Sequence, residues 1–167
     1  MPRYNKKITS LMEYHDFKQA IGELPIMKQA FLSVLFFAGC RVSEALALKG
    51  TDINCMGDTI FIQFFRLKGS KQTDPQELPR TEYLAWLCGN DGKLFSFGRR
   101  TAHRIVKKVF PELYPHYFRM NRITKVDILF GDATVYNVFG ISATSIDHYR
   151  GKVDIKRVGK ALREELV

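Results

Sequence analysis

Two stretches in the first half of the sequence carry cations that could reach a phosphate. Arg41 stands where an apolar helical pattern breaks and a second helix begins, so its guanidinium can point into a cleft. Glu44 follows three residues later, at the spacing that would let its carboxylate hold Arg41 in place. Lys68 and Lys71 flank a Gly-Ser turn, from which an ammonium can reach a phosphate or a leaving oxygen.

Two later stretches extend this set. His116 and Arg119 are three residues apart, which places them on one helical face where both can bind one phosphate. Tyr149 closes the series. Each of these residues taken alone is more often an ordinary surface charge or a half-buried aromatic ring. Their order along the chain therefore matters more than any one of them.

Helical and strand patterns surround these stretches. Apolar residues recur at helical spacing and predict helices over residues 11–21, 26–37, 42–48, 80–87, 99–110, 116–129 and 133–139. Ser43 is the predicted N-cap of the third of these helices. A β-branched and aromatic strand is expected over 59–65, a returning strand over 76–78, and turns over 52–58 and 68–71. The fold class we expect is mostly α with a small antiparallel β-sheet (α+β).

The composition is typical of a compact domain that binds a polyanion. The chain has 167 residues, is 46% hydrophobic and contains 13 Phe and 7 Tyr, enough for a substantial core. It carries 26 Lys+Arg against 17 Asp+Glu, a net charge of +9, which favours nucleic acid first and an acidic membrane surface second. The first residues lack the apolar stretch of a signal peptide, and the longest apolar run, 31–39, is too short to span a bilayer. We expect a soluble cytoplasmic protein with no membrane partner.

The cysteines offer no metal-binding pattern. Cys40, Cys55 and Cys88 form no Cys-x-x-Cys pair and have no His at zinc-finger spacing. An odd number of cysteines without such spacing predicts reduced, partly buried thiols in a cytosolic protein.

The order of the reactive stretches resembles the signature of the tyrosine recombinase (phage integrase) family. The family's G-x-R-x-S-E-x-L-x-L stretch is matched in every term by Gly39, Arg41, Ser43, Glu44, Leu46 and Leu48. Its K-G-x-K turn with a following L-P strand is matched by Lys68, Gly69, Lys71, Leu78 and Pro79. Its H-x-L-R-H box keeps His116 and Arg119, and Gly-Asp, Phe-Gly and a late Tyr follow in the family's order. The resemblance spans about residues 11–149.

The resemblance implies a catalytic domain that cleaves and rejoins DNA through a 3′-phosphotyrosyl link at Tyr149. Arg41 and Arg119 would stabilise the charge that develops on the phosphate, which suits two permanently charged, forked guanidiniums. His116 would donate to the same phosphate or take the phenolic proton. Lys68 would protonate the leaving 5′-oxygen. No metal or other cofactor is required for this reaction.

The remaining expectations concern binding and domain layout. The partner is double-stranded DNA, with self-association on DNA as a dimer or tetramer. Lys71 is the alternative proton donor, and the basic residues expected to follow DNA phosphates are Lys71, Arg99, Arg100, Arg104, Lys107 and Lys108. We expect a basic arm at 1–10, the catalytic domain at 11–152 and a helical tail at 153–167, resembling the family's subunit-docking helix. The family's separate N-terminal DNA-binding domain is not expected within this chain.

Two departures from the family pattern keep alternatives open. Ile141 stands where the family usually has a hydrogen-bonding His or Trp, and the gap from Gly140 to Tyr149 is one residue short. Tyr136 is the alternative nucleophile. The alternative functions are a catalytically weakened, integrase-derived DNA-binding protein and a type IB topoisomerase-like relaxation of DNA.

Overall fold

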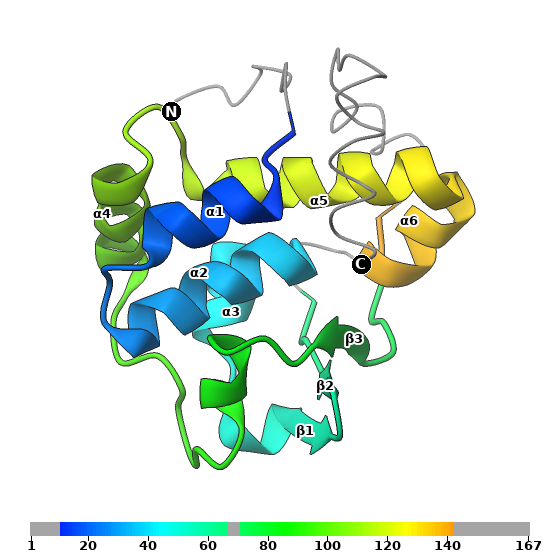
Figure 1. Cartoon of the computed structure of the whole chain (residues 1–167). Coiled ribbons are helices and arrows are strands. Elements are labelled where there is room, and N and C mark those ends of the chain that lie inside the picture. The colour runs from blue at the N-terminus through cyan, green and yellow to red at the C-terminus, as the bar shows by residue number, and fades with distance from the viewer. Residues whose placement is uncertain (1–10, 67–70, 142–167) are drawn as a thin grey trace.

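The computed structural model of the chain describes residues 11–66 and 71–141, and Figure 1 shows the arrangement of their elements. The α-helices are α1 (Tyr14–Ile21), α2 (Ile26–Ala38), α3 (Val42–Leu46), α4 (Arg99–Val109), α5 (Pro115–Phe130) and α6 (Asp132–Phe139). The 3-10 helices are η1 (Gly50–Asp52) and η2 (Leu84–Leu87), and the strands are β1 (Ile53–Met56), β2 (Thr59–Ile62) and β3 (Gln76–Pro79). None of the described helices is long and apolar enough to cross a membrane. The predicted fold class, mostly α with a small antiparallel sheet, is confirmed.

Aromatic rings join α1, α2 and α5 into the main core. Helix α2 is apolar nearly all round and is buried along most of its length, as befits a helix at the centre of a domain. Phe17 of α1 stacks on Phe36 of α2 at 4.3 Å between ring centroids, and it meets Phe118 of α5 edge-on at 6.1 Å. Such offset and edge contacts stabilise beyond the area they bury. They hold α5 across α1 and α2, as Figure 1 shows.

The sheet in the described part of the chain has the strand order β1-β2-β3 and is antiparallel throughout. Ile60 of the central strand lies opposite Cys55 of β1 and opposite Leu78 of β3. The side chains of Ile60, Ile62 and Leu78 point into the core and are buried. The strands predicted over 59–65 and 76–78 therefore exist, and β2 ends at Ile62, where its pairing with β3 ends.

Strand β1 lies inside the segment that the sequence pattern predicted to be turns, so that prediction was wrong for residues 53–56. β1 is an edge strand whose inward side chains, Ile53 and Cys55, are only half buried. The alternation of apolar and polar residues in Ile-Asn-Cys-Met is too weak to predict a strand, and pairing with β2 decides the conformation of β1. The expected turn is confined to the tip, where Gly57 has φ 58°.

The sequence pattern predicts Ser43 as the N-cap of α3, but the N-cap in the structure is Arg41. The backbone of Arg41 is extended, with φ −71° and ψ 149°, and its N–H donates to the Glu44 carboxylate at 2.8 Å. The carboxylate at the third helical position thus satisfies the N–H of the capping residue, as in a capping box. Helix α3 therefore begins two residues earlier than Ser43 capping would allow.

Residues 80–87 contain η2 and not the predicted α-helix. Thr81 accepts two hydrogen bonds, from the N–H of Leu84 at its hydroxyl (3.3 Å) and from the N–H of Ala85 at its carbonyl (2.8 Å). β3 ends directly before this segment, and Cys88 directly after η2 has extended backbone. Between β3 and Cys88 the turns therefore end in a short 3-10 helix and do not continue as an α-helix.

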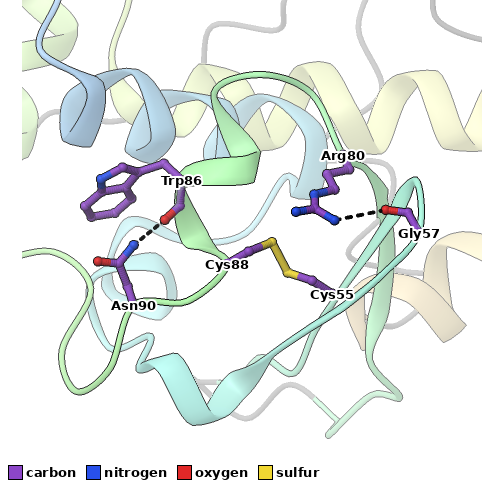
Figure 2. Close-up of a disulfide and its surroundings, with 6 residues drawn as sticks. All are labelled: Cys55, Gly57, Arg80, Trp86, Cys88 and Asn90. Carbon is purple, nitrogen blue, oxygen red and sulfur yellow. Dashed lines mark hydrogen bonds between the residues drawn. A yellow bond between two sulfur atoms is a disulfide. The ribbon is translucent and has the colours of Figure 1, made fainter.

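A disulfide joins Cys55 of β1 to Cys88 after η2, with the two Cα atoms 6.1 Å apart, as Figure 2 shows. Cys40 is free and buried. The prediction of reduced thiols is therefore wrong for two of the three cysteines. The pair is separated by 33 residues and meets only because the sheet packs beside η2, a proximity that cysteine spacing does not reveal. Arg80 fastens the same corner by donating to the carbonyl of Gly57 at 3.2 Å.

Candidate active site

Gly39 closes α2 and brings it close to two later helices. It has φ 60°, in the left-handed region that favours glycine at the end of a helix. A Cβ at this position would lie 2.6 Å from Cβ of Arg122 and 3.1 Å from Cε1 of Phe139. The Gly39 carbonyl accepts a hydrogen bond from Nη1 of Arg119 at 2.9 Å. Gly39 therefore lets α5 and α6 pack directly against the segment that carries Arg41.

Glu44 is the centre of a buried network of charges. Its Oε1 accepts from Nη1 of Arg41 at 2.8 Å, so the contact expected from their spacing is present. Its Oε2 accepts from the backbone N–H of Arg41 at 2.8 Å and from Nη1 of Arg66 at 3.2 Å. The Glu44 side chain is fully buried, whereas that of Arg41 keeps 16% of its surface exposed. One side of the Arg41 guanidinium is thus fixed while the side chain still reaches the surface.

The surrounding cations keep Glu44 ionised. Burial on its own raises the pKa of this carboxyl, but the Arg41 N–H, the charges of Arg119 and Arg66, and the Arg41 guanidinium together hold its pKa below the ordinary value. Burial lowers the pKa of Arg66, and Glu44 opposes that shift. An arginine has so high an intrinsic pKa that it stays protonated in such surroundings. The network is therefore a carboxylate held among guanidiniums.

Helix α5 supplies the second arginine. Pro115 occupies its first turn, where the missing N–H has no cost, and His116 follows as a half-buried residue. Arg119 lies one turn later, with no exposed surface, and its guanidinium carbon is 5.7 Å from the centroid of the Phe139 ring. The structure thus gathers Arg41, Glu44 and Arg119 around the end of α2, with His116 one helical turn from Arg119.

The end of the hairpin touches the end of α6. Lys68 and Tyr149 lie outside the described residues. Lys71 is exposed, its backbone N–H donates to the carbonyl of Gly140 at 3.0 Å, and its Nζ is 5.1 Å from the centroid of the Tyr136 ring. Tyr136 is 39% exposed on α6. The segment that leads into β3 is therefore fastened to the end of the helix that precedes Tyr149 in the sequence.

Ile141 packs inward instead of offering a hydrogen bond. It is 5% exposed and belongs to a small apolar cluster between α5 and α6, whose other buried members are Ile123, Val126, Val135 and Phe139. The position that the family pattern assigns to a hydrogen-bonding residue therefore carries a packing residue in this chain.

The basic residues predicted on one helix lie on α4, which packs against α3 and α5. Four of them are exposed, namely Arg99, Arg100, Arg104 and Lys108. Lys107 is half buried and is used within the fold, since its Nζ donates to the carbonyl of Pro111 at 2.8 Å and lies 3.7 Å from the centroid of the Tyr114 ring. In Figure 1, α4 lies beside the start of α5, and α6 lies at its other end.

Sequence reasoning assigned no role to Arg66, which is the second arginine whose guanidinium donates to Glu44. A usable signal was present, because residues 60, 62 and 64 of the strand pattern are apolar and point inward. Continuing the alternation places Arg66 on the same buried face. A charged residue at an inward position of a strand needs a charged or hydrogen-bonding partner.

The arrangement suits an anion. Among the described residues, no group of three or more His, Cys, Asp or Glu side chains is gathered in a way that could hold a metal. Arg41 offers a fixed and partly exposed guanidinium, and forked guanidiniums match the oxygens of a phosphate.

Comparison with solved structures identifies the fold of this chain, whereas comparison with sequences finds no relative. No protein-family model matches the sequence, and no curated protein does. Solved structures match over nearly the whole chain. The XerH site-specific recombinase bound to palindromic difH substrate, in its post-cleavage complex, gives a TM-score of 0.72 at 18% identity, covering 95% of this chain and 53% of that chain.

Two further structures agree. The XerA recombinase gives a TM-score of 0.65 at 18% identity, covering 93% of this chain and 64% of its own. The integrase from mycobacterium phage Brujita gives 0.55 at 14% identity, covering 96% and 66%. This chain spans about half the length of the XerH chains that it matches. It therefore has the fold that the resemblance to tyrosine recombinases predicted.

Proposed function

We propose that this chain is the catalytic domain of a tyrosine recombinase that cleaves and rejoins double-stranded DNA. The observation that carries the proposal is the buried Glu44 carboxylate, which fixes the partly exposed Arg41 within a cluster that also contains Arg119. The same fold is found in XerH bound to its difH substrate. Neither observation alone would suffice, since a fold hosts many functions and a guanidinium binds many anions.

The proposed reaction uses groups that the sequence motifs align. The phenolic oxygen of Tyr149 attacks the phosphorus and forms a P–O bond, while the bond to the 5′-oxygen breaks and that oxygen takes the electron pair. His116 receives the phenolic proton, and Lys68, or alternatively Lys71, supplies a proton to the leaving oxygen. Arg41 and Arg119 stabilise the added charge on the non-bridging oxygens. Rejoining is the same sequence of steps in reverse.

DNA binding is proposed to use the basic side of the domain. The exposed cations of α4 would neutralise backbone phosphates near the start of α5, where His116 lies. Such contacts position the duplex without reading its sequence. Self-association of several copies on DNA, as a dimer or tetramer, belongs to the same proposal.

Covalent trapping tests the proposal. A duplex with a nick beside the cleavage site loses its short fragment after cleavage, so the protein–DNA adduct cannot be resealed and accumulates. We expect the wild-type chain to form a denaturant-stable adduct with the 3′-phosphate of the labelled strand, and the released fragment to carry a 5′-hydroxyl. A chain that binds duplex DNA at low salt without ever forming an adduct would contradict the enzymatic part of the proposal.

One observation favours a second candidate function. Ile141 is buried in an apolar cluster and cannot donate a hydrogen bond to a phosphate. A recombinase-derived DNA-binding protein with weakened catalysis would fit that feature. The same trapping assay separates the two candidates, because this alternative predicts duplex binding with little or no adduct.

A further inference from the structure

Arg66 lies beyond the end of β2 and is 2% exposed. Its guanidinium donates to three different parts of the fold. Nη1 donates to Oε2 of Glu44 in α3 at 3.2 Å, and Nη2 donates to the carbonyl of Val138 in α6 at 2.9 Å. Nε donates to the hydroxyl of Thr73, on the strand side that returns toward β3, at 3.1 Å. One buried side chain therefore joins α3, α6 and the base of the hairpin.

The backbone of Arg66 is held as well. The side-chain oxygen of Gln72 accepts from the Arg66 N–H at 3.0 Å, and its Nε2 donates to the Arg66 carbonyl at 2.9 Å. The Arg66 guanidinium carbon also lies 4.9 Å from the centroid of the Phe64 ring. The backbone N–H, the carbonyl and each guanidinium nitrogen of Arg66 therefore have a hydrogen-bond partner, which leaves the side chain few alternative rotamers.

A buried charge of this kind calls for an explanation. Removing a guanidinium from water is expensive, and well-packed apolar residues often stabilise a fold as well as a buried ion pair does. Stability alone therefore does not account for Arg66. Its geometry offers another reason, because Arg66 shares Oε2 of Glu44 with the backbone N–H of Arg41, while Oε1 accepts from the Arg41 guanidinium. Arg66 therefore helps to fix the orientation of the carboxylate that holds Arg41.

Arg66 also connects this carboxylate to the end of α6. The Val138 carbonyl that it binds is two residues before Gly140, the C-cap of α6, whose own carbonyl accepts from Lys71. Gln76 of β3 donates to the same Val138 carbonyl at 3.4 Å. A shift of α6 relative to the sheet would therefore be transmitted through Arg66 to Glu44.

We propose that Arg66 is a positioning residue that couples the end of α6 to the orientation of Arg41 through Glu44. The inference rests on the proposed function, since its effect is measured on DNA cleavage. Arg66 touches no reacting atom in this account. Without it, the Glu44 carboxylate loses a partner that lowers its pKa, so it takes up a proton at higher pH and releases Arg41 sooner as the solution is acidified.

The test compares Arg66→Met with Arg66→Lys and with a matched control, Arg80→Met. Arg80 is an arginine at the other end of the sheet that donates to the Gly57 carbonyl. Each full-length chain is assayed for duplex affinity, for the single-turnover rate of adduct formation on the nicked duplex at saturating protein, and for thermal unfolding, from mildly acidic to mildly basic pH.

We expect Arg66→Met to leave duplex affinity within about twofold and to lower the saturating cleavage rate by about tenfold or more, the effect of losing a hydrogen bond to a charged group. The acidic limb of its pH profile should move to higher pH. Arg66→Lys should recover part of the rate, because the cation on Glu44 is retained. Arg80→Met should change neither rate nor profile.

A double-mutant cycle addresses the route of the effect. If Arg66 acts through Glu44, the pair Glu44→Gln with Arg66→Met should cleave no more slowly than Glu44→Gln alone. Fully additive losses, or an unchanged rate and pH profile in folded Arg66→Met, would overturn the inference. If Arg66→Met unfolds, Arg66→Lys decides the question. A lysine cannot donate to Glu44 and to the Val138 carbonyl in the forked geometry of Arg66, so its cleavage rate should stay below that of the wild type, and a wild-type rate would overturn the inference. If the wild-type chain forms no adduct, both the proposed function and this inference are contradicted. If the wild-type chain forms the adduct and substitution of Arg66 changes neither rate nor pH profile, only the inference is contradicted.

Discussion

The two ends of strand β2 are held in different ways. At its start, the Cys55–Cys88 disulfide and the hydrogen bond from Arg80 to the Gly57 carbonyl fasten the sheet to the segment around η2. Beyond its end, Arg66 enters a buried network with Glu44 and Arg41. A covalent link constrains the unfolded chain and needs no ionised group. A buried charge network fixes the orientation of its side chains, and its strength depends on pH. One end thus suits stability, and the other suits the placement of a functional cation.

The first and largest expected effect concerns the charged end. Arg41→Ala should reduce adduct formation on a nicked duplex by about two to three orders of magnitude, as loss of one charge-stabilising donor at a reacting centre does. The temperature of thermal unfolding should change little. Arg80→Ala, at the disulfide end, is the control and should cleave like the wild type. Equal losses in both variants would show that the two ends of β2 do not differ in the way described.

The second prediction concerns the disulfide end. Replacing Cys55 and Cys88 together by Ser should lower the free energy of unfolding by about 2–4 kcal/mol, the usual effect of opening a loop of this kind. The cleavage rate of the folded protein should stay within about twofold, since no group in the Glu44 network is altered. Denaturant titration and single-turnover trapping measure the two quantities. Thiol titration of the unfolded wild-type chain should find Cys40 reactive and the other pair protected until a reductant is added.

A smaller effect should appear as a pH dependence of stability. The pKa of Glu44 is below its ordinary value of 4.5, so its stabilising contribution is complete above that value and is lost as pH falls through the lower, folded-state pKa. Glu44→Gln should lower the free energy of unfolding by about 2 kcal/mol at neutral pH. The variant should lose less stability than the wild type on acidification. Parallel stability curves for the two chains would show that Glu44 is not held ionised by its neighbours.

The elements that the sequence predicted well are those whose own pattern is strong. Helices predicted over 26–37, 99–110, 116–129 and 133–139 differ from α2, α4, α5 and α6 by only one residue at any end. Their apolar faces or continuous apolar runs decide the outcome locally. The helix predicted over 11–21 begins instead at Tyr14, because no strong start signal precedes it and helix ends are set by weak local contacts.

Other failures have a different cause, which is contact between distant parts of the chain. β1 is stabilised by pairing with β2, and the partnership of Cys55 with Cys88 exists only once the sheet lies beside η2. Arg66 meets Val138 across 72 positions of sequence. Residue spacing does not predict such contacts, although an arginine at an inward strand position does indicate that it needs a buried partner.

For the site, the sequence predicted the pairing of Arg41 with Glu44 because three-residue spacing places them together whatever the rest of the fold does. The approach of Arg119 to Gly39 depended on the packing of α5 against α2, which the motif order implied and spacing could not supply. Lys68 and Tyr149 lie outside the described residues, and their roles stay predictions.

The most direct test of the account is the comparison of wild type with Tyr149→Phe on the nicked duplex. The substitution removes one hydroxyl group and no charge at neutral pH, so duplex affinity should be nearly unchanged. We predict a denaturant-stable protein–DNA adduct for the wild type and none for Tyr149→Phe, with the adduct mapping to a peptide that contains residue 149. An adduct of equal yield from Tyr149→Phe would contradict the account and move the search for the nucleophile to Tyr136.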